Sequence, residues 1–217
     1  MSVRVIVADD QEIVRTGLSM ILDAQPGIEV VGAAPDGRQA VELARRLRPD
    51  VCLFDIRMPG TDGIEATRLL AGPGVADPLA VVVITTFDTD EYIYGALQAG
   101  ARGFLLKGAE PDQLVQAIHA AVQGDALIDP AVTGRLLAAF AGSGPATTPA
   151  QPLEALTDRE EDVLGRVARG RTNAEIAREL HISTSTVKFH LTGLMTKLGA
   201  RNRVELAIWA HQTNRVT

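Results

Sequence analysis

The first 125 residues alternate short apolar runs with amphipathic stretches. The apolar runs are rich in valine, isoleucine and leucine, and they lie at residues 3–8, 28–34, 51–55, 79–85 and 102–106. Runs that are apolar at consecutive positions are typical of strands buried on both faces of a parallel sheet. Their alternation with helices predicts a doubly wound α/β fold, here with a five-stranded parallel sheet and right-handed crossovers.

Helical spacing follows the first two apolar runs. The first of these helices presents one face formed by Ile13, Gly17, Leu18, Ile21 and Leu22. The second ends at Pro49, because proline interrupts a helix, and is marked by Val41, Leu43, Ala44 and Leu47. Such apolar faces are the ones that helices pack against a sheet.

Beyond residue 152 the pattern is helical. Two capping boxes, Thr157-x-x-Glu160 and Thr172-x-x-Glu175, begin the first two helices, and Gly170 has the position of a C-cap glycine. A third helix is predicted at 184–198 and a fourth at 203–212. The tail is therefore predicted to be an all-α, four-helix domain.

A stretch of different composition separates the two patterned regions. Residues 141–152 are small, uncharged and rich in proline and glycine, as flexible linkers are, and residues 129–140 resemble a short extra helix. We therefore divide the chain into a domain at 1–125, an extra helix with a flexible linker at 126–152, and a second domain at 153–217.

Composition narrows the class of protein. The chain has one cysteine, Cys52, which excludes an intramolecular disulfide and a cluster of cysteine metal ligands. The N-terminus reaches two aspartates by residue 10 and so does not resemble a signal peptide. No apolar run approaches the roughly 20 residues that a membrane helix needs. We expect a cytoplasmic protein with no membrane partner.

The formal net charge of −6 is unevenly distributed. Residues 1–149 hold 11 Lys and Arg against 19 Asp and Glu, whereas residues 150–217 hold 10 against 8. A mildly basic tail on an acidic body suggests a polyanionic partner for the tail, although chance produces differences of this size equally well.

Polar residues follow the predicted strands. In a doubly wound sheet ligands bind beyond the carboxyl ends of the strands, where this chain places Asp9, Asp10, Asp55, Thr85 and Lys107. Three carboxylates in one place repel one another, and a hard divalent cation such as Mg²⁺ relieves that repulsion. Such a site favours phosphoryl chemistry with a carboxylate as the nucleophile. The alternative, ordinary polar residues in turns, explains this combination poorly.

Four segments resemble the receiver domains of response regulators: VADDQ (7–11), LFDIRMPGTDG (53–63), ITTFD (84–88) and AGARGFLLKG (99–108). The resemblance extends from residue 3 to about residue 123 and implies a flavodoxin-like fold with Asp55 as the phosphoacceptor. The Mg²⁺ ligands that it implies are Asp9 (through water), Asp10, Asp55 and the backbone carbonyl of Arg57. It also implies phosphoryl contacts from Thr85 and Lys107.

One position departs from the commonest receiver pattern. Many receivers carry a switch tyrosine three residues before the lysine, where this chain has Phe104. The ring can still turn inward when Thr85 moves toward a phosphoryl group, but it lacks the hydroxyl; a plain core ring is the alternative. Phe87 is expected to flank the pocket and, with Arg57, to slow loss of the phosphoryl group.

The helix predicted at 184–198 has two distinct faces. Its apolar stripe is formed by Val187, Leu191, Leu194, Met195 and Leu198. The opposite face suits a recognition helix in a major groove, since Lys188 can reach a guanine edge or a phosphate and Phe189 a thymine methyl group. This face also carries Ser185, Thr192 and Thr196. Amphipathicity alone favours a small helical bundle used for protein contacts.

Residues 156–207 are similar to the DNA-binding domain of the LuxR family, most specifically in TVKFH (186–190) and KLGARNR (197–203). With the receiver in front, the chain resembles the NarL/FixJ class of response regulators. The resemblance implies double-stranded DNA as a partner, contacted by Thr184, Ser185, Lys188, Phe189 and Thr192. Family members often have a basic residue at position 192, so affinity of a single domain is expected to be weak and dimerisation important.

The last helix forms the DNA-bound dimer contact in the class resembled. Here that contact is expected at Val204, Ile208 and His211. Trp209 is either an interface ring or a core ring.

Together these observations predict a switch. We expect a partner histidine kinase to phosphorylate Asp55 with Mg²⁺, so that the Thr85 and Phe104 region rearranges and the homodimer binds DNA to regulate transcription. We expect no enzyme, apart from self-catalysed phosphotransfer and autodephosphorylation. A phosphatase would need a general acid near Asp55, where Arg57 cannot serve. A regulator independent of phosphorylation would not need the strand-end residues.

Overall fold

The computed structural model describes residues 2–86, 89–128, 154–213 and 215. The described residues form two units. One comprises residues 2–122 with 126–128, and the other comprises 123–125 with the residues from 154 onward. Among the described helices, none combines the length and apolar character needed to cross a membrane.

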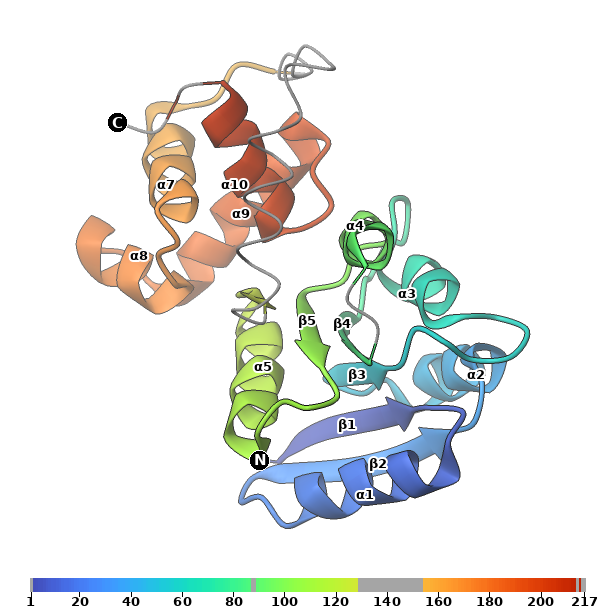
Figure 1. The fold of residues 1–217 in the computed structure, drawn as a ribbon. Helices are drawn as coiled ribbons and strands as arrows, with labels where there is room; N and C mark the ends of the chain where they lie inside the picture. Colours follow the sequence, from blue (N-terminus) through green and yellow to red (C-terminus); the bar gives the residue numbers. More distant parts are fainter. Residues whose placement is uncertain (1, 87–88, 129–153, 214, 216–217) are drawn as a thin grey trace. The chain divides into compact units, whose positions relative to one another are not determined.

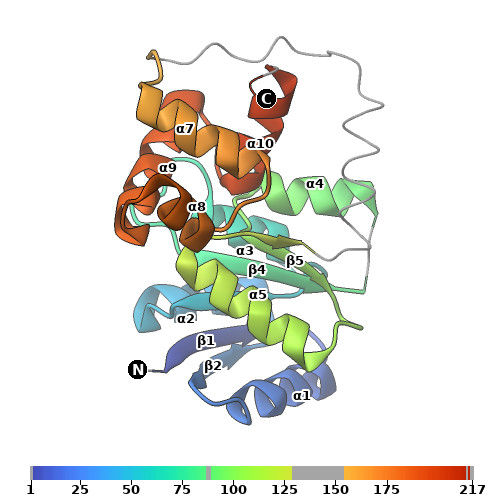
Figure 2. The same cartoon turned by 90° about the vertical axis from the view of Figure 1, so that its left-hand side faces the viewer.

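The first unit is built on a sheet in which every strand runs parallel to its neighbours (Figures 1 and 2). The order across the sheet is β2-β1-β3-β4-β5-β6. The strands are β1 (Val3–Ala8), β2 (Ile28–Ala34), β3 (Val51–Phe54), β4 (Ala80–Thr85), β5 (Gly103–Leu106) and β6 (Leu127–Ile128). The predicted doubly wound parallel sheet is thus confirmed.

The number of strands is six rather than the predicted five. The additional strand β6 lies at the edge of the sheet, with Leu127 opposite Gly103 and Ile128 opposite Phe104. Two residues are too short a run to produce a strand pattern, and they fall in the segment predicted as extra helix and linker. The rest of that segment, including the helix expected at 129–140, lies outside the described residues.

Helices cover both faces of this sheet (Figure 1). On one face α1 (Glu12–Asp23) and α5 (Pro111–Gln123) bury Leu22 and Ile118 against β1, β3 and β4. On the other face α2 (Gly37–Leu47) and α3 (Gly63–Ala71) bury Val41 and Leu70 against β1, β3 and β4. Among the described residues of this unit, the remaining helix is α4 (Asp90–Gln98). The core is aliphatic, with Phe54 and Phe104 as its fully buried rings.

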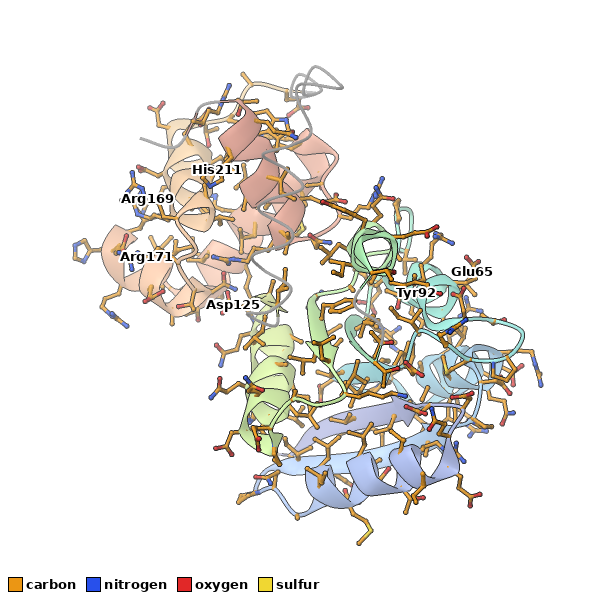
Figure 3. The ribbon with its side chains drawn as sticks, in the orientation of Figure 1. Glu65, Tyr92, Asp125, Arg169, Arg171 and His211 are labelled. Atoms are coloured by element: carbon orange, nitrogen blue, oxygen red, sulfur yellow. The ribbon has the colours of Figure 1, made fainter. Side chains whose placement is uncertain are left out.

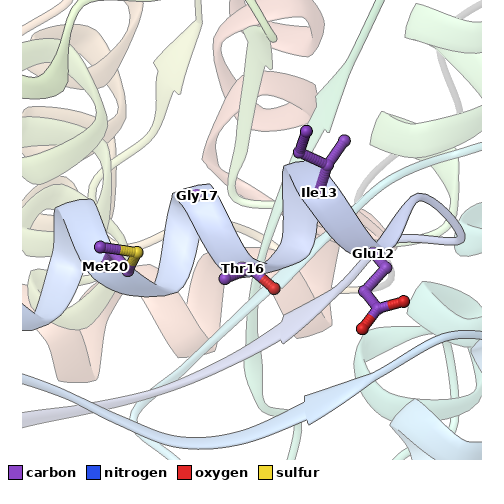
Figure 4. A pocket seen from close by; sticks show the side chains of 5 residues that line it. All are labelled: Glu12, Ile13, Thr16, Gly17 and Met20. Carbon is purple, nitrogen blue, oxygen red and sulfur yellow. The ribbon is translucent and has the colours of Figure 1, made fainter.

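The prediction of which residues form the buried apolar face of α1 is partly wrong. Leu22 is buried and Leu18 packs against the core, as expected, but Ile13 is 83% exposed and Ile21 is also exposed. The exposed residues are one position out of register with the buried row, so they lie on a neighbouring face of the helix. Figure 4 shows Ile13, Gly17 and Met20 lining a shallow surface hollow there.

The second unit contains the four predicted helices around one core. They are α7 (Asp158–Ala168), α8 (Asn173–Leu180), α9 (Thr184–Leu198) and α10 (Arg203–Gln212). Both predicted capping boxes are present, at Thr157 and Thr172. Gly170, with φ of +75°, follows the end of α7 as predicted. The predicted stripe of α9 packs into the core, and Trp209 is buried beside it as a core ring.

A partly buried ion pair links two helices of this unit. The Nζ of Lys197 on α9 lies 2.9 Å from Oε2 of Glu160, the residue that completes the capping box of α7. Burial raises the pKa of Glu160, but hydrogen bonds from Lys197 and Thr157 outweigh that effect and hold the pKa below its usual value. The charge of Glu160 is therefore stabilised in the folded unit.

Candidate functional site

The predicted strand-end residues come together at the carboxyl edge of the sheet. Asp9 follows β1, Asp55 follows β3, Thr85 ends β4 and Lys107 follows β5. The sheet ladder continues into these residues, because Asp55 N donates to Ala8 O at 2.8 Å and Lys107 N donates to Thr85 O at 2.9 Å. The backbone therefore fixes where the four side chains begin.

Three carboxylates and one ammonium group share this edge. Asp9, Asp10 and Asp55 each offer an oxygen, and these atoms lie within 4.8 Å of one another. Lys107 Nζ lies 2.6 Å from Asp9 Oδ2 and 2.9 Å from Asp55 Oδ2. Asp9 and Asp55 are buried, whereas Asp10 is exposed. One lysine thus bridges two buried carboxylates, while the third faces solvent.

The crowding perturbs the acid–base properties of the pocket. Burial raises the pKa of Asp55 and the charge of Asp9 adds to the rise, although Lys107 opposes both. Burial lowers the pKa of Lys107, but the carboxylates of Asp9 and Asp55 outweigh it, and the net pKa is raised. Lys107 is therefore held in its charged form, and Asp55 remains under-compensated by the lysine alone.

The donor set fits a hard divalent cation. Asp9 Oδ2 is buried, and its partner is the ammonium group of Lys107 at 2.6 Å. The carboxylates of Asp9, Asp10 and Asp55 together offer an all-oxygen set, the kind of ligand that Mg²⁺ prefers. The exposed Asp10 leaves room for the waters that Mg²⁺ retains. Arg57, whose carbonyl was predicted as a ligand, lies exposed two residues after Asp55.

Two glycines that were not singled out in the sequence shape the loop after Asp55. A Cβ at Gly63 would lie 1.9 Å from Asp55 O, and one at Gly37 would lie 2.3 Å from Thr61 O. Gly63 N donates to Ile56 O, and Gly37 N donates to Thr61 O. The loop is therefore clamped between the N-termini of α2 and α3. The one feature of the sequence that could have indicated this loop is the glycine at the first position of both α2 and α3.

Contacts from Arg15 and Gln11 also hold the pocket in place, and they were not predicted from the sequence. Arg15 on α1 donates from Nη1 to the backbone carbonyl of Asp9 at 2.7 Å, and Gln11 N donates to Asp9 Oδ1 at 2.9 Å. These contacts fix the turn that carries Asp9 and Asp10. Nothing in the local pattern distinguishes Arg15 from an ordinary surface arginine of a helix.

The predicted switch residues are both buried. Thr85 and Phe104 have no exposed surface, and Phe104 pairs with Val83 and Ile128 in the sheet. Phe104 is therefore a core ring in this structure. Phe87, which was expected to flank the pocket, lies outside the described residues.

The predicted recognition face of α9 is exposed. Its residues Thr184, Ser185, Lys188, Phe189 and Thr192 all lie at the surface, together with Thr196. Lys188 and Lys197 are the charged residues of this helix, which carries no acidic side chain. The face is therefore weakly positive and rich in hydroxyl groups.

The residues predicted for the dimer contact lie on α10. Val204 and Ile208 are half-buried, and His211 is exposed. His211 Nε2 is 3.1 Å from the carbonyl oxygen of Ala168, at the end of α7 (Figure 3). This contact ties His211 to its own unit and leaves Val204 and Ile208 as the apolar part of the surface.

Comparison with known proteins gives a relative for both units. Residues 5–119 match the response regulator receiver domain, and residues 154–210 match the bacterial regulatory proteins of the luxR family. The transcriptional regulatory protein LiaR of Bacillus subtilis (strain 168) is 42% identical over 99% of this chain and 99% of its own. The nitrate/nitrite response regulator protein NarL of Escherichia coli (strain K12) is 38% identical over 96% of this chain and 94% of its own.

Solved structures resemble the chain over its whole length. The response regulator ChrA of a heme-sensing two-component system is 37% identical, with a TM-score of 0.54 over 99% of each chain. The two-component response regulator RcsB in a complex with DNA is 26% identical, with a TM-score of 0.57 over 100% of each chain. The likeness therefore includes both units and the order in which they occur.

Proposed function

The chain belongs to the NarL/FixJ class of response regulators, and we propose that phosphorylation of Asp55 controls its dimerisation and its binding to DNA. Members of this class combine a receiver with a LuxR-type DNA-binding domain and regulate transcription, so the expectation that the chain is not an enzyme is confirmed. The proposed donor is a phosphohistidine of a partner kinase, and the proposed place of action is the cytoplasm, where kinase and DNA are both within reach.

The observation that carries the proposal is the Lys107 bridge. Stability alone explains poorly why a lysine lies between two buried carboxylates. Burying the ammonium and carboxylate groups removes their hydration, and this penalty can exceed the attraction between them. It becomes useful when a dianionic phosphoryl group is added to one carboxylate, since the ammonium then lies next to the new negative charge. The bridge therefore supports Asp55 as acceptor and Lys107 as the partner of the phosphoryl group.

The residues of the pocket have separate roles in the proposed transfer. An oxygen of Asp55 attacks the phosphorus, a new O–P bond forms, and the N–P bond of the donor imidazole breaks with its electron pair leaving on nitrogen. Lys107 holds an oxygen of the transferred group, and the Thr85 hydroxyl hydrogen-bonds another. Bound Mg²⁺ supplies positive charge beside those oxygens. Asp10, Asp55 and the Arg57 carbonyl are the proposed ligands, with Asp9 acting through water.

The DNA-binding part of the proposal concerns α9 and α10. We place Thr184, Ser185, Lys188, Phe189 and Thr192 in the major groove, because they form one exposed face without an acidic residue. Val204, Ile208 and His211 on α10 are proposed as the contact between two copies on DNA. Two tethered domains on neighbouring half-sites bind more tightly than one through their effective concentration.

The first experiment is intact-mass analysis after incubation with acetyl phosphate and Mg²⁺. We expect one phosphoryl adduct on the wild-type chain and none on Asp55→Asn, which keeps the shape of the side chain without the nucleophile. The control variant Asp50→Asn removes an exposed aspartate before β3 and should leave the adduct intact. An adduct that persists on Asp55→Asn would overturn the assignment of Asp55.

Binding to DNA is then measured with and without the adduct. We expect the phosphorylated wild-type chain to enrich a defined duplex from a random pool, and Asp55→Asn treated in the same way to enrich it weakly. Equal enrichment by both would show a regulator that does not depend on phosphorylation.

A further inference from the structure

Several hydroxyl groups on and beside the recognition face of α9 already have partners within the same segment. Thr192 Oγ1 donates to Lys188 O at 3.0 Å, and Thr196 Oγ1 donates to Thr192 O at 3.0 Å. The hydroxyls of Ser183 and Ser185 lie 2.6 Å apart, and Ser183 Oγ caps the helix by accepting from Thr186 N. The threonine protons are therefore directed along the helix rather than outward.

An aromatic ring stands out from the same face. Phe189 is 76% exposed and lies one turn before Thr192. Its ring meets the His190 ring edge to face, with centroids 5.8 Å apart. In the described part of the second unit, no other large hydrophobic side chain is as exposed. Such exposure on a helix that otherwise buries its apolar residues indicates a contact surface.

The chemistry of this face selects among the groups that a major groove presents. Guanine offers acceptors and cytosine a donor, whereas thymine alone offers a methyl group. Hydrogen-bonded readout of guanine by Thr192 and Thr196 would require protons that the two hydroxyls already donate to carbonyls. A phenyl ring and threonine methyl groups instead match an apolar target. A helix without acidic residues is also compatible with a polyanion.

We infer that the α9 face reads thymines in duplex DNA by apolar contact, with Phe189 and the Thr192 methyl group packed against their C5 methyl groups. Lys188 supplies the polar contact to phosphate or to a guanine edge. The inference rests on the proposed DNA-binding function and adds to it the class of site that is recognised. A half-site should then contain at least one thymine at a fixed position opposite Phe189.

The test separates the methyl group from every other property of the base. Duplexes are first selected from a random pool with the phosphorylated full-length chain, and each conserved thymine is then replaced in turn by deoxyuridine, which lacks only the methyl. We expect one or two positions per half-site at which uracil weakens binding about fourfold, as expected for removing one buried methyl-sized group from an apolar contact. At the position opposite Phe189, the Phe189→Ala variant should bind the thymine and uracil duplexes equally.

Two further variants test whether the contact with thymine depends on apolar groups or on the Thr192 hydroxyl. Phe189→Leu retains an apolar side chain and should still prefer thymine to uracil. Thr192→Val has the same shape without the hydroxyl and should keep the preference for thymine over uracil. If Thr192→Val loses binding tenfold or more, its hydroxyl contacts DNA and the inference is overturned. Because Phe189 is exposed, unfolding of Phe189→Ala followed through Trp209 should match wild type.

The outcomes distinguish failure of the apolar readout of thymine from failure of the proposed DNA-binding function. If the chain selects duplexes that bind thymine and uracil equally at every position, DNA binding stands and apolar readout is wrong. If it binds the single strand of the selected site more tightly than the duplex, Phe189 stacks on bases and the inference is again overturned. If no DNA is enriched in either phosphorylation state, the proposed DNA-binding function itself fails.

Discussion

A side-chain carbon at Gly63 would lie 1.9 Å from the backbone carbonyl oxygen of Asp55, so α3 begins in direct contact with the proposed phosphoacceptor. Thr67 Oγ1 closes the same turn by donating to Gly63 O at 2.6 Å. The position of Asp55 thus depends on a residue eight places further along the chain, which carries no chemistry of its own.

Replacing Gly63 with alanine should therefore damage both stability and phosphorylation. The methyl group must displace backbone rather than a flexible side chain, so we expect a loss of about 1–3 kcal/mol in the free energy of unfolding. The adduct with acetyl phosphate should form at least tenfold more slowly. Calorimetry and intact mass measure the two effects.

Gly17 provides the matched control, because a Cβ at this helical position of α1 meets nothing within 4 Å. Gly17→Ala should stabilise the receiver by about 0.5–1 kcal/mol and leave phosphorylation unchanged. Gly63→Ala with wild-type stability and rate would show that the loop after Asp55 yields freely.

Removing the Lys107 ammonium should strengthen the binding of Mg²⁺. Lys107→Met leaves the carboxylates of Asp9 and Asp55 without their cationic neighbour, so the receiver should unfold at a lower temperature without Mg²⁺. The dissociation constant for Mg²⁺ in titration calorimetry should fall by about tenfold or more, since a positive charge next to the ligand set is lost.

The comparison variant is Lys197→Met, which removes the partly buried ammonium group that pairs with Glu160 in the other unit. It should not change the Mg²⁺ affinity. Weaker Mg²⁺ binding by Lys107→Met would mean that the lysine organises the ligands rather than competing with the cation.

The sequence predicted the elements with strong periodicity well, and the reasons are local. The apolar stripe of α9 and the capping boxes at Thr157 and Thr172 depend on residues one to four places apart, and α9 and α10 were predicted at their observed bounds. The strand-end set could be predicted because parallel strands bring their carboxyl ends to one edge.

Features that depend on spatial proximity were missed or misread. Strand β6 is specified by its neighbour β5, not by any pattern in Leu127 and Ile128. The contacts of Gly37 and Gly63 with distant carbonyls leave no trace in periodicity. Ile13 was assigned to the buried face of α1 because it is apolar, but hydrophobic residues also occur singly at surfaces.

Glu160 should make the stability of the DNA-binding unit depend on pH. Its pKa is lowered in the folded unit, so the folded state binds this proton more weakly than the unfolded chain does. The contribution of Glu160 is then fully present above its ordinary pKa of 4.5 and is lost as the pH falls through the lowered value. Urea unfolding followed by the fluorescence of Trp209, the one tryptophan of the chain, reports on this unit.

The variant Glu160→Gln should flatten that dependence below pH 4.5, and Lys197→Met should lower the free energy of unfolding at pH 7 by about 1.5–3 kcal/mol, the range for a hydrogen bond to a charged group. An unchanged pH dependence in Glu160→Gln would assign the acid sensitivity to other carboxylates.

Phe104→Tyr should destabilise the receiver although tyrosine is common at this position in related domains. The ring has no exposed surface, so a hydroxyl added to it must find a partner or remain buried without one, at a cost of about 1–3 kcal/mol. Phe54→Tyr, at another fully buried ring, gives the cost of a hydroxyl in the core. A Phe104→Tyr receiver as stable as wild type would reveal a path by which the ring reaches the surface.

Binding to DNA should depend only moderately on salt. Several basic side chains of the second unit pair with carboxylates inside it, among them Arg166 with Glu179 and Arg171 with Glu179. Each phosphate contact contributes about −0.9 to the slope of log K against log salt, and Lys188→Ala should reduce the slope by about one such step. Arg166→Ala is the control and should leave the slope unchanged.

The formal charge of the pocket at Asp55 determines which kind of ion neutralises it. Three carboxylates and one ammonium give it a formal charge of −2, which a single divalent cation cancels. A monovalent ion of the surrounding salt leaves it negative, so common salt is a poor competitor at this site. In the proposed phosphorylation, the single negative charge of Asp55 would be replaced by about two, so that the pocket with a bound divalent cation would again carry a net negative charge. We expect this one excess charge to drive the rearrangement of neighbouring groups.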